Sequence, residues 1–126
     1  MRRKLLLKDH KVESIMTDFS NLEDEQTIAV STRIRIGIAE NDNYNCLVEI
    51  SPEYRNIKTG DSVVFSVKCI VFFELTDDVT QAEKLEIIRE DGVQEAYNLT
   101  RNKVNEIIKL SNIDFPSMPD YSTVKN

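Results

Sequence analysis

The most regular pattern in the sequence is a period of two between residues 62 and 75. Hydrophobic side chains occupy every second position there, namely Val63, Phe65, Val67, Cys69, Val71, Phe73 and Leu75. Such alternation is typical of a β-strand with one buried face. Ile70 and Phe72 make the other face hydrophobic as well at one end. We therefore expect this end of the strand to be covered on both sides.

Two earlier stretches also alternate. Residues 4–16 do so irregularly, which predicts an edge strand with a break or bulge near Asp9 and His10. Residues 27–39 alternate cleanly, with isoleucines on one face and arginines on the other. The polar residues 18–26 between them predict a connection that passes across the sheet.

A further strand is predicted to begin at Tyr44, after a hairpin turn at residues 40–43. Pro52 lacks a backbone donor, so we expect it to end regular pairing or to produce an irregular edge. Residues 58–61 then predict a second turn, which leads into the strand described first.

After Leu75 the hydrophobic period lengthens to about 3.6 residues, which indicates helix. A short acidic helix is predicted to end at Asp91-Gly92, and a longer one to follow over residues 93–111 and to cover the sheet. The two prolines in residues 114–121 predict an extended segment whose apolar side chains are exposed.

Length and charge restrict the class of protein. The 126 residues fit one domain, spanning 1–126. The 16 basic and 22 acidic residues give a net charge of -6, which argues against nucleic acid as a partner. No hydrophobic run approaches membrane-spanning length, and Lys8, Asp9 and His10 interrupt the signal-like start. The expected location is the cytoplasm.

Side chains that carry chemistry are few. His10 is the single histidine, the three glycines form no phosphate-binding loop, and no nucleophile and base can be paired. Cys46 and Cys69 fall on hydrophobic strand faces and define no metal site. We therefore predict a protein that is not an enzyme and that needs no cofactor or metal.

The sequence contains more apolar side chains than can be buried between one sheet and one helix. The simpler interpretation is that Ile70, Phe72 and the apolar residues of 115–121 form core and dimer contacts. The alternative is a groove for extended polypeptide, since methionine and aromatic side chains adapt to many shapes. The residues leave both interpretations open.

Several local strings resemble the SecB family of export chaperones and its SecB-like relatives. Residues 12–21 resemble the family's first strand and the acidic-aromatic-asparagine run after it. Residues 91–101 resemble the start of its long helix, with Tyr97 and Arg101 in the matching places, and Phe115-Pro116 resembles the start of its extended lid segment. The family's final helix has no counterpart before Asn126, which indicates a divergent member.

The resemblance implies an α+β fold in which a four-stranded antiparallel sheet carries one long helix on one face, assembled as dimers or tetramers. It implies a holdase that binds non-native or extended polypeptide and is linked to protein export. Acidic residues dock the translocation motor in export members, but Ser14 and Ser66 stand in two of those places and only Asp18 is retained.

The candidate client-binding residues are Ile34, Ile36, Phe72, Tyr97, Phe115, Met118 and Tyr121. An alternative function is a dedicated interaction or structural subunit, accessory to one partner such as an antitoxin, or a phage or mobile-element product.

Overall fold

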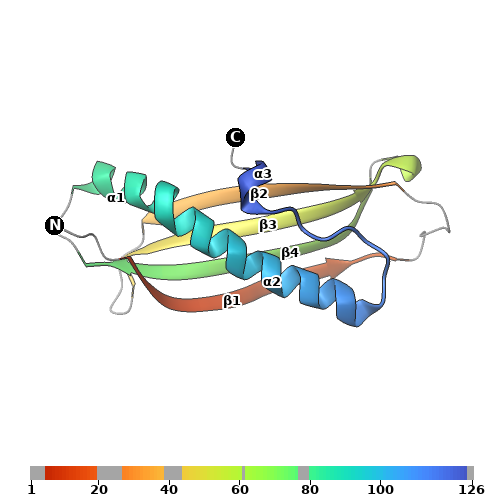
Figure 1. Ribbon diagram of the computed structural model, residues 1–126, viewed down its shortest axis with the longest axis horizontal. Coiled ribbons are helices and arrows are strands. Elements are labelled where there is room, and N and C mark those ends of the chain that lie inside the picture. Colours follow the sequence, from red (N-terminus) through yellow and green to blue (C-terminus); the bar gives the residue numbers. More distant parts are fainter. Residues whose placement is uncertain (1–4, 20–26, 39–43, 61, 77–79, 125–126) are drawn as a thin grey trace.

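The computed structural model describes residues 5–19, 27–38, 44–60, 62–76 and 80–124. They form an α+β fold in which one long helix packs on one face of a four-stranded antiparallel sheet (Figure 1). The strands are β1 (Leu5–Thr17), β2 (Ile28–Ile38), β3 (Cys46–Asn56) and β4 (Ser62–Leu75). The helices are η1 (Ile57–Thr59), α1 (Gln81–Ile87), η2 (Ile88–Gly92), α2 (Val93–Ser111) and α3 (Tyr121–Val124). The predicted fold class is confirmed.

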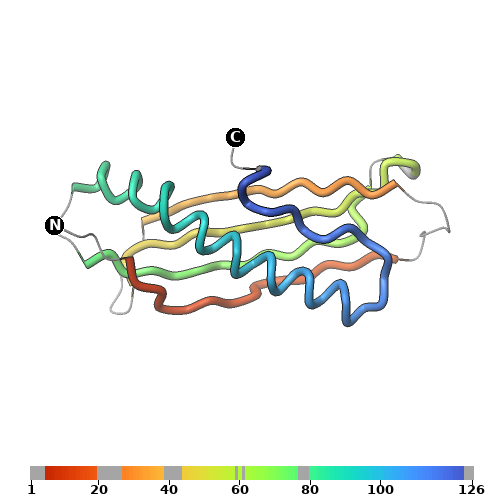
Figure 2. Tube along the Cα trace, viewed as in Figure 1, coloured from red at the N-terminus to blue at the C-terminus, as the bar shows by residue number. Residues whose placement is uncertain are grey.

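The strands lie in the order β1-β4-β3-β2, so β1 and β2 form opposite edges of the sheet (Figure 2). The chain must pass from one edge to the other between them, as the polar residues 18–26 predicted, although residues 20–26 lie outside the described part. The antiparallel pairing of β2 with β3 agrees with the hairpin predicted at residues 40–43, which themselves lie outside the described residues.

The two outer strands differ in regularity. The pairing of β1 with β4 shifts register between Leu7 and Asp9, which confirms the predicted irregularity, and shifts again between Val12 and Ser14. The pairing of β2 with β3 keeps a single register from Ile28 to Ile38. The sheet therefore has one bulged edge and one smooth edge.

Pro52 lies inside a central strand, so the prediction that it ends regular pairing or marks an edge is wrong. It pairs with Thr32 of β2, and β3 continues to Asn56. Its effect is local: the pairing of β3 with β4 stops after Ile50 and resumes in the same register at Glu53. The pairing with β2 is continuous through this gap.

The buried face of β4 follows the predicted alternation, except at its start. Tyr54 pairs with Phe65 but Arg55 pairs with Val63, so Val64 is an extra residue in β4. A bulge of this kind changes the alternation, and Val64 is buried whereas Val63 is only half-buried. The prediction that Val63 belongs to the buried face was therefore wrong.

The helical region is one continuous rod, so the helix end predicted at Asp91-Gly92 is also wrong. Thr80 begins the rod with a capping box to Glu83. Gly92 has helical dihedrals, φ -68 and ψ -40, inside the π-turn η2 that joins α1 to α2. A Cβ atom at Gly92 would lie 3.3 Å from side-chain carbons of Leu5 and Ile88. This glycine permits the close approach of helix to sheet.

The core lies between this rod and the sheet. Alternate residues of β3 and β4 meet the predicted stripe of α2. From β3 and β4 the fully buried side chains include Val48, Ile50, Tyr54, Cys69, Val71 and Phe73, and from α2 they include Ala96, Tyr97, Thr100 and Val104. None of the described helices lies on the opposite face of the sheet (Figure 1).

Candidate functional site

Residues 113–120 run back over the helix-covered face as an extended segment, which ends in α3 near β2 (Figure 1). We name residues 113–124 the tail. Asn112 ends α2 in the left-handed conformation, φ 55. The tail is extended as predicted, but its apolar side chains are not all exposed, because Phe115 is 8% exposed and Met118 is 0% exposed. That part of the prediction is corrected.

Three side chains of α2 hold the tail by its backbone. Tyr97 Oη donates to the carbonyl oxygen of Pro119 at 2.6 Å, and Arg101 Nε donates to that of Met118 at 2.8 Å. Asn105 Oδ1 accepts from the backbone N–H of Met118 at 2.9 Å. These residues are four positions apart and so lie on one face of the helix. We name Tyr97, Arg101 and Asn105 the clamp.

Two contacts extend the clamp toward α3. Arg101 pairs with Asp120 at 3.1 Å, and the rings of Tyr97 and Tyr121 lie 5.3 Å apart. Burial raises the pKa of Tyr97, and hydrogen bonding to Thr32 of β2 and the charge of Arg101 oppose that rise. The hydroxyl therefore remains protonated and able to donate at neutral pH.

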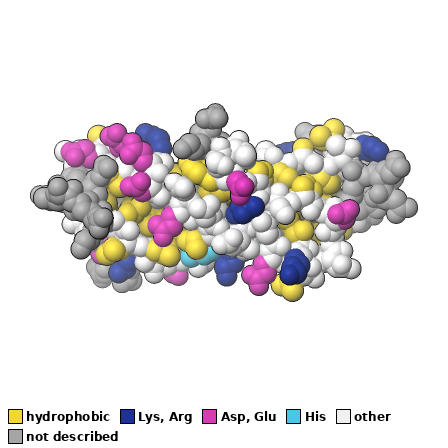
Figure 3. All heavy atoms as spheres, in the orientation of Figure 1, with side chains coloured by type: hydrophobic (Ala, Val, Ile, Leu, Met, Phe, Trp, Pro, Cys, Tyr) yellow, Lys and Arg dark blue, Asp and Glu magenta, His cyan; other side chains and the backbone are white. Residues whose placement is uncertain are grey.

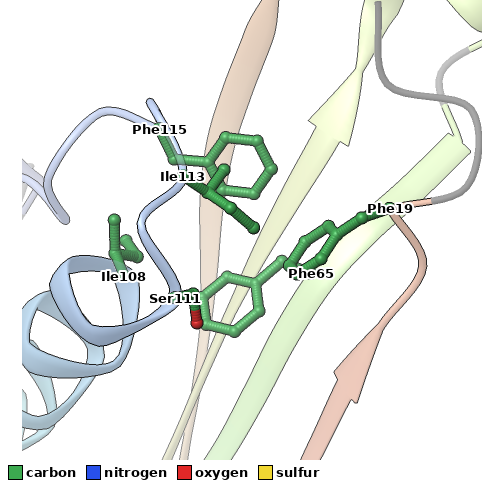
Figure 4. A pocket seen from close by; sticks show the side chains of 6 residues that line it. All are labelled: Phe19, Phe65, Ile108, Ser111, Ile113 and Phe115. Carbon is green, nitrogen blue, oxygen red and sulfur yellow. The ribbon is translucent and has the colours of Figure 1, made fainter.

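An aromatic cluster fixes the start of the tail. The Phe115 ring lies 5.7 Å from those of both Tyr54 and Phe19 and 6.3 Å from that of Phe65. The six side chains drawn in Figure 4 come from the residues just after β1, from β4, from α2 and from the tail, and no water-sized space remains between them. This end of the tail is packed as core.

The helix-facing side of β2 is less well covered. The helical rod crosses the sheet diagonally and leaves part of the β2 edge without a helix above it (Figure 1). Ile34 is 37% exposed, and Ile36 is half-buried against the core. Figure 3 shows hydrophobic side chains at the surface along this side of the molecule. Ile34 and Ile36 thus form an apolar strip on the side of the sheet that carries the tail.

The structure therefore brings six of the seven candidate residues to one face of the sheet. Tyr97, Phe115 and Met118 are buried, Ile36 and Tyr121 are half-buried, and Ile34 is the most exposed. Phe72 lies on the opposite face, where its ring is 4.5 Å from that of Tyr44 and Lys11 Nζ lies 5.6 Å from its centroid. Phe72 is separated from the other six by the thickness of the sheet.

The opposite face is polar across its middle. Glu49 lies 4.0 Å from Arg35 and 3.5 Å from Lys68, and Lys68 lies 3.4 Å from Glu13. The row alternates in charge across all four strands and so stabilises the pairing of neighbouring strands. Asp18, the retained acidic residue, is exposed just after β1, and its N–H donates to the carbonyl oxygen of Val64.

Sequence reasoning did not select Asn105 as a site residue. Its position beside the hydrophobic stripe of α2 was the available signal, but surface asparagines commonly occupy such positions. Only the return of the tail places a backbone N–H within reach of its side chain.

Within the described ranges no cluster of three or more histidine, cysteine or carboxylate residues could hold a metal ion. The described helices include none with the length and hydrophobicity to cross a membrane.

Comparison with known proteins supports the fold. The sequence matches no protein-family profile and no curated protein sequence. Its structure is similar to that of Rv1957, a SecB-like chaperone of Mycobacterium tuberculosis solved with a ChAD peptide from the Rv1956 HigA1 antitoxin. The TM-score is 0.66 at 14% identity, over 91% of this chain and 86% of the chaperone chain. The two chains thus share their fold, a four-stranded antiparallel sheet with one long helix packed on it.

Proposed function

We propose that this protein is a divergent SecB-like chaperone, a single domain over residues 1–126, that binds non-native or extended polypeptide and acts as a holdase. The observation that carries the proposal is the clamp, because Tyr97, Arg101 and Asn105 each form a hydrogen bond to a backbone atom of an extended segment. Recognition of backbone does not depend on the bound sequence, which is what a chaperone requires.

The apolar strip supplies the second part of such a site. Ile34 and Ile36 lie on the tail's side of the sheet and are incompletely covered, so a client could bury its hydrophobic side chains against them. Tyr97, Tyr121, Phe115 and Met118 belong to the same proposed site, the last two by fixing the tail that borders it. Phe72 is proposed as a separate contact on the opposite face.

The test is suppression of aggregation. A chemically denatured client is diluted into buffer with and without the protein, and light scattering is followed. We expect suppression near a stoichiometric ratio, and loss of most of it in Ile34→Lys. Leu110→Lys is the matched control, since Leu110 is also exposed, at 78%, but lies on α2. An unchanged scattering curve with the wild-type protein would reject the holdase proposal.

A dedicated accessory role is the second candidate function. It is favoured by the peptide bound to the similar chaperone, which comes from an antitoxin. In that case one protein would co-purify at fixed stoichiometry and unrelated denatured clients would aggregate as in buffer. A link to protein export is less favoured, because Ser14 and Ser66 replace the expected acidic residues.

We also propose a cytoplasmic homo-oligomer, either a dimer or a tetramer, without catalytic activity. Ile70 and Phe72 are only half-buried on the face that lacks a helix, and a second copy could cover them. Light scattering coupled to size exclusion measures the mass. A single species near 14.5 kDa would reject the oligomer.

A further inference from the structure

The smooth edge of the sheet, β2, has the regularity that the addition of another strand requires. Its pairing with β3 has no register shift over Ile28–Ile38, a length of roughly 35 Å. The other edge, β1, is interrupted by two bulges, which is how proteins prevent strand addition. β2 contains no proline and no bulge, so it can accept another strand along its length.

The two faces of β2 differ in chemistry. Ile34 and Ile36 point to the helix-covered side, where Ile34 is partly exposed. Arg33 and Arg35 point to the opposite side and are both exposed. A strand added beside β2 would place its alternate side chains next to the isoleucines and next to the arginines in turn.

The two arginines are available for a partner. Arg33 lies opposite Ser51, which is neutral, and it makes no ion pair within the described residues. Arg35 is 69% exposed and reaches Glu49 only at 4.0 Å, whereas Lys68 approaches Glu49 to 3.5 Å. Acidic side chains on an added strand would pair with both arginines.

A second copy of the chain fits this edge poorly. Antiparallel pairing of two β2 strands centred on Ile34 would place Arg33 opposite the other copy's Arg35, and Arg35 opposite its Arg33. Like charges in directly opposed positions destabilise a strand pair. The arginines thus disfavour self-association through β2 and favour an acidic partner.

We propose that β2 binds an extended polypeptide strand whose residues alternate between acidic and aliphatic or aromatic side chains, the acidic ones facing Arg33 and Arg35. This inference rests on the proposed function and specifies where and what the protein binds. Salt weakens such binding, because the ion pairs are exposed to solvent.

The experiment uses fluorescent peptides matched in length to β2 and measures their affinity by anisotropy. The first peptide alternates glutamate with valine, the second alternates lysine with valine, and the third is the first with N-methyl groups on alternate residues. We expect the wild-type protein to bind only the first peptide, since N-methylation removes the donors that strand addition needs.

The variant R33E/R35E should bind the glutamate peptide about tenfold more weakly and should gain affinity for the lysine peptide. Lys109→Glu is the matched control, because Lys109 is exposed on α2 and not on β2, so the change should leave both affinities unchanged. Circular dichroism confirms that the variants fold, and the exchange of preference excludes a loss caused by misfolding.

Equal affinity of the wild-type protein for the glutamate and lysine peptides, or unchanged binding of the N-methylated one, would overturn the inference. The aggregation assay separates this result from failure of the proposed function. If the wild-type protein suppresses aggregation but binds the glutamate and lysine peptides equally well, the holdase proposal stands while the β2 inference falls. A charge-dependent peptide affinity without suppression of aggregation would support the inference and reject general holdase activity.

Discussion

Arg101 Nε donates a 2.8 Å hydrogen bond to the carbonyl oxygen of Met118, seventeen residues further along the chain. The same guanidinium pairs with Asp120 through Nη2 at 3.1 Å. One side chain of α2 therefore holds the tail at two points, through a backbone atom and through a charge.

Arg101→Ala should loosen the tail without unfolding the sheet. The guanidinium is about one-third exposed, so we expect a loss of only about 1 kcal/mol in the free energy of unfolding. Limited proteolysis should cut the variant faster within the tail. Lys109→Ala, an exposed change on the same helix, is the control, and equal proteolysis rates for the two variants would contradict the role of the clamp.

Phe115→Ala should be far more destabilising, because the ring is 8% exposed and contacts three other aromatic rings. Truncation of a buried phenylalanine costs about 3 kcal/mol or more. Urea unfolding monitored by circular dichroism measures the loss. Ser117→Ala, an exposed change two residues away, should leave the midpoint unchanged, and a loss under about 1 kcal/mol in Phe115→Ala would show that the tail is not part of the core.

Gly92→Val should destabilise the protein by about 2 kcal/mol through overpacking. The first added carbon already lies 3.3 Å from Ile88, which is fully buried, and 3.7 Å from the Phe73 ring. Gly37→Ala is the control, since its added carbon makes only ordinary contacts at 3.6 Å with Leu47. A thermal midpoint for Gly92→Val equal to that of the wild type would contradict the close packing of η2 on the sheet.

Stability should fall as the pH decreases through the range in which His10 titrates. Burial lowers the pKa of His10 below its ordinary 6.5, the charge of Lys103 lowers it further, and Asp9 opposes the shift. Below about pH 6.5 the imidazole of His10 therefore binds a proton more readily in the unfolded chain than in the folded chain. The free energy of unfolding consequently decreases as the pH falls, until the pH is below the pKa of His10 in the folded protein.

His10→Gln should remove this part of the pH dependence. Urea unfolding gives the free energy of unfolding of both proteins at about pH 7.5 and about pH 5.5, and the difference between wild type and variant is compared at the two pH values. The stability of the wild type relative to the variant should be greater at the higher pH. A difference that stays constant between the two pH values would show that His10 does not contribute.

The thiols should resist modification in the folded protein. Burial raises the pKa of Cys46 to about 11, its thiol donates to the carbonyl oxygen of Phe73, and burial also raises the pKa of Cys69. Both side chains are fully buried, and thiolate is the reactive form. Iodoacetamide labelling followed by mass spectrometry should be slow in buffer and fast in urea. Ser117→Cys gives an exposed thiol as the control, and equal rates at all three cysteines in buffer would contradict this burial.

Only some residues of the candidate site could be identified from the sequence. Tyr97 and Ile36 could be selected because their periodic positions place them on the buried faces of a helix and a strand. Arg101 was singled out by the local resemblance to the SecB family, whereas Asn105 was not selected as a site residue. The alternation in residues 62–75 placed Phe72 on the face opposite the helix, as the structure does, but it could not tell a client contact from a contact with a second copy.

The sequence by itself determined the order of strands and helices along the chain and the buried stripe of α2. These features follow from the periodicity of hydrophobic residues, which is local. Only the tertiary structure decided that Gly92 lies within a continuous helix, that Pro52 lies within a central strand, and that Phe115 and Met118 are buried. Each of these outcomes depends on contacts between segments distant in the sequence, which outweigh local propensities of about 1 kcal/mol per residue.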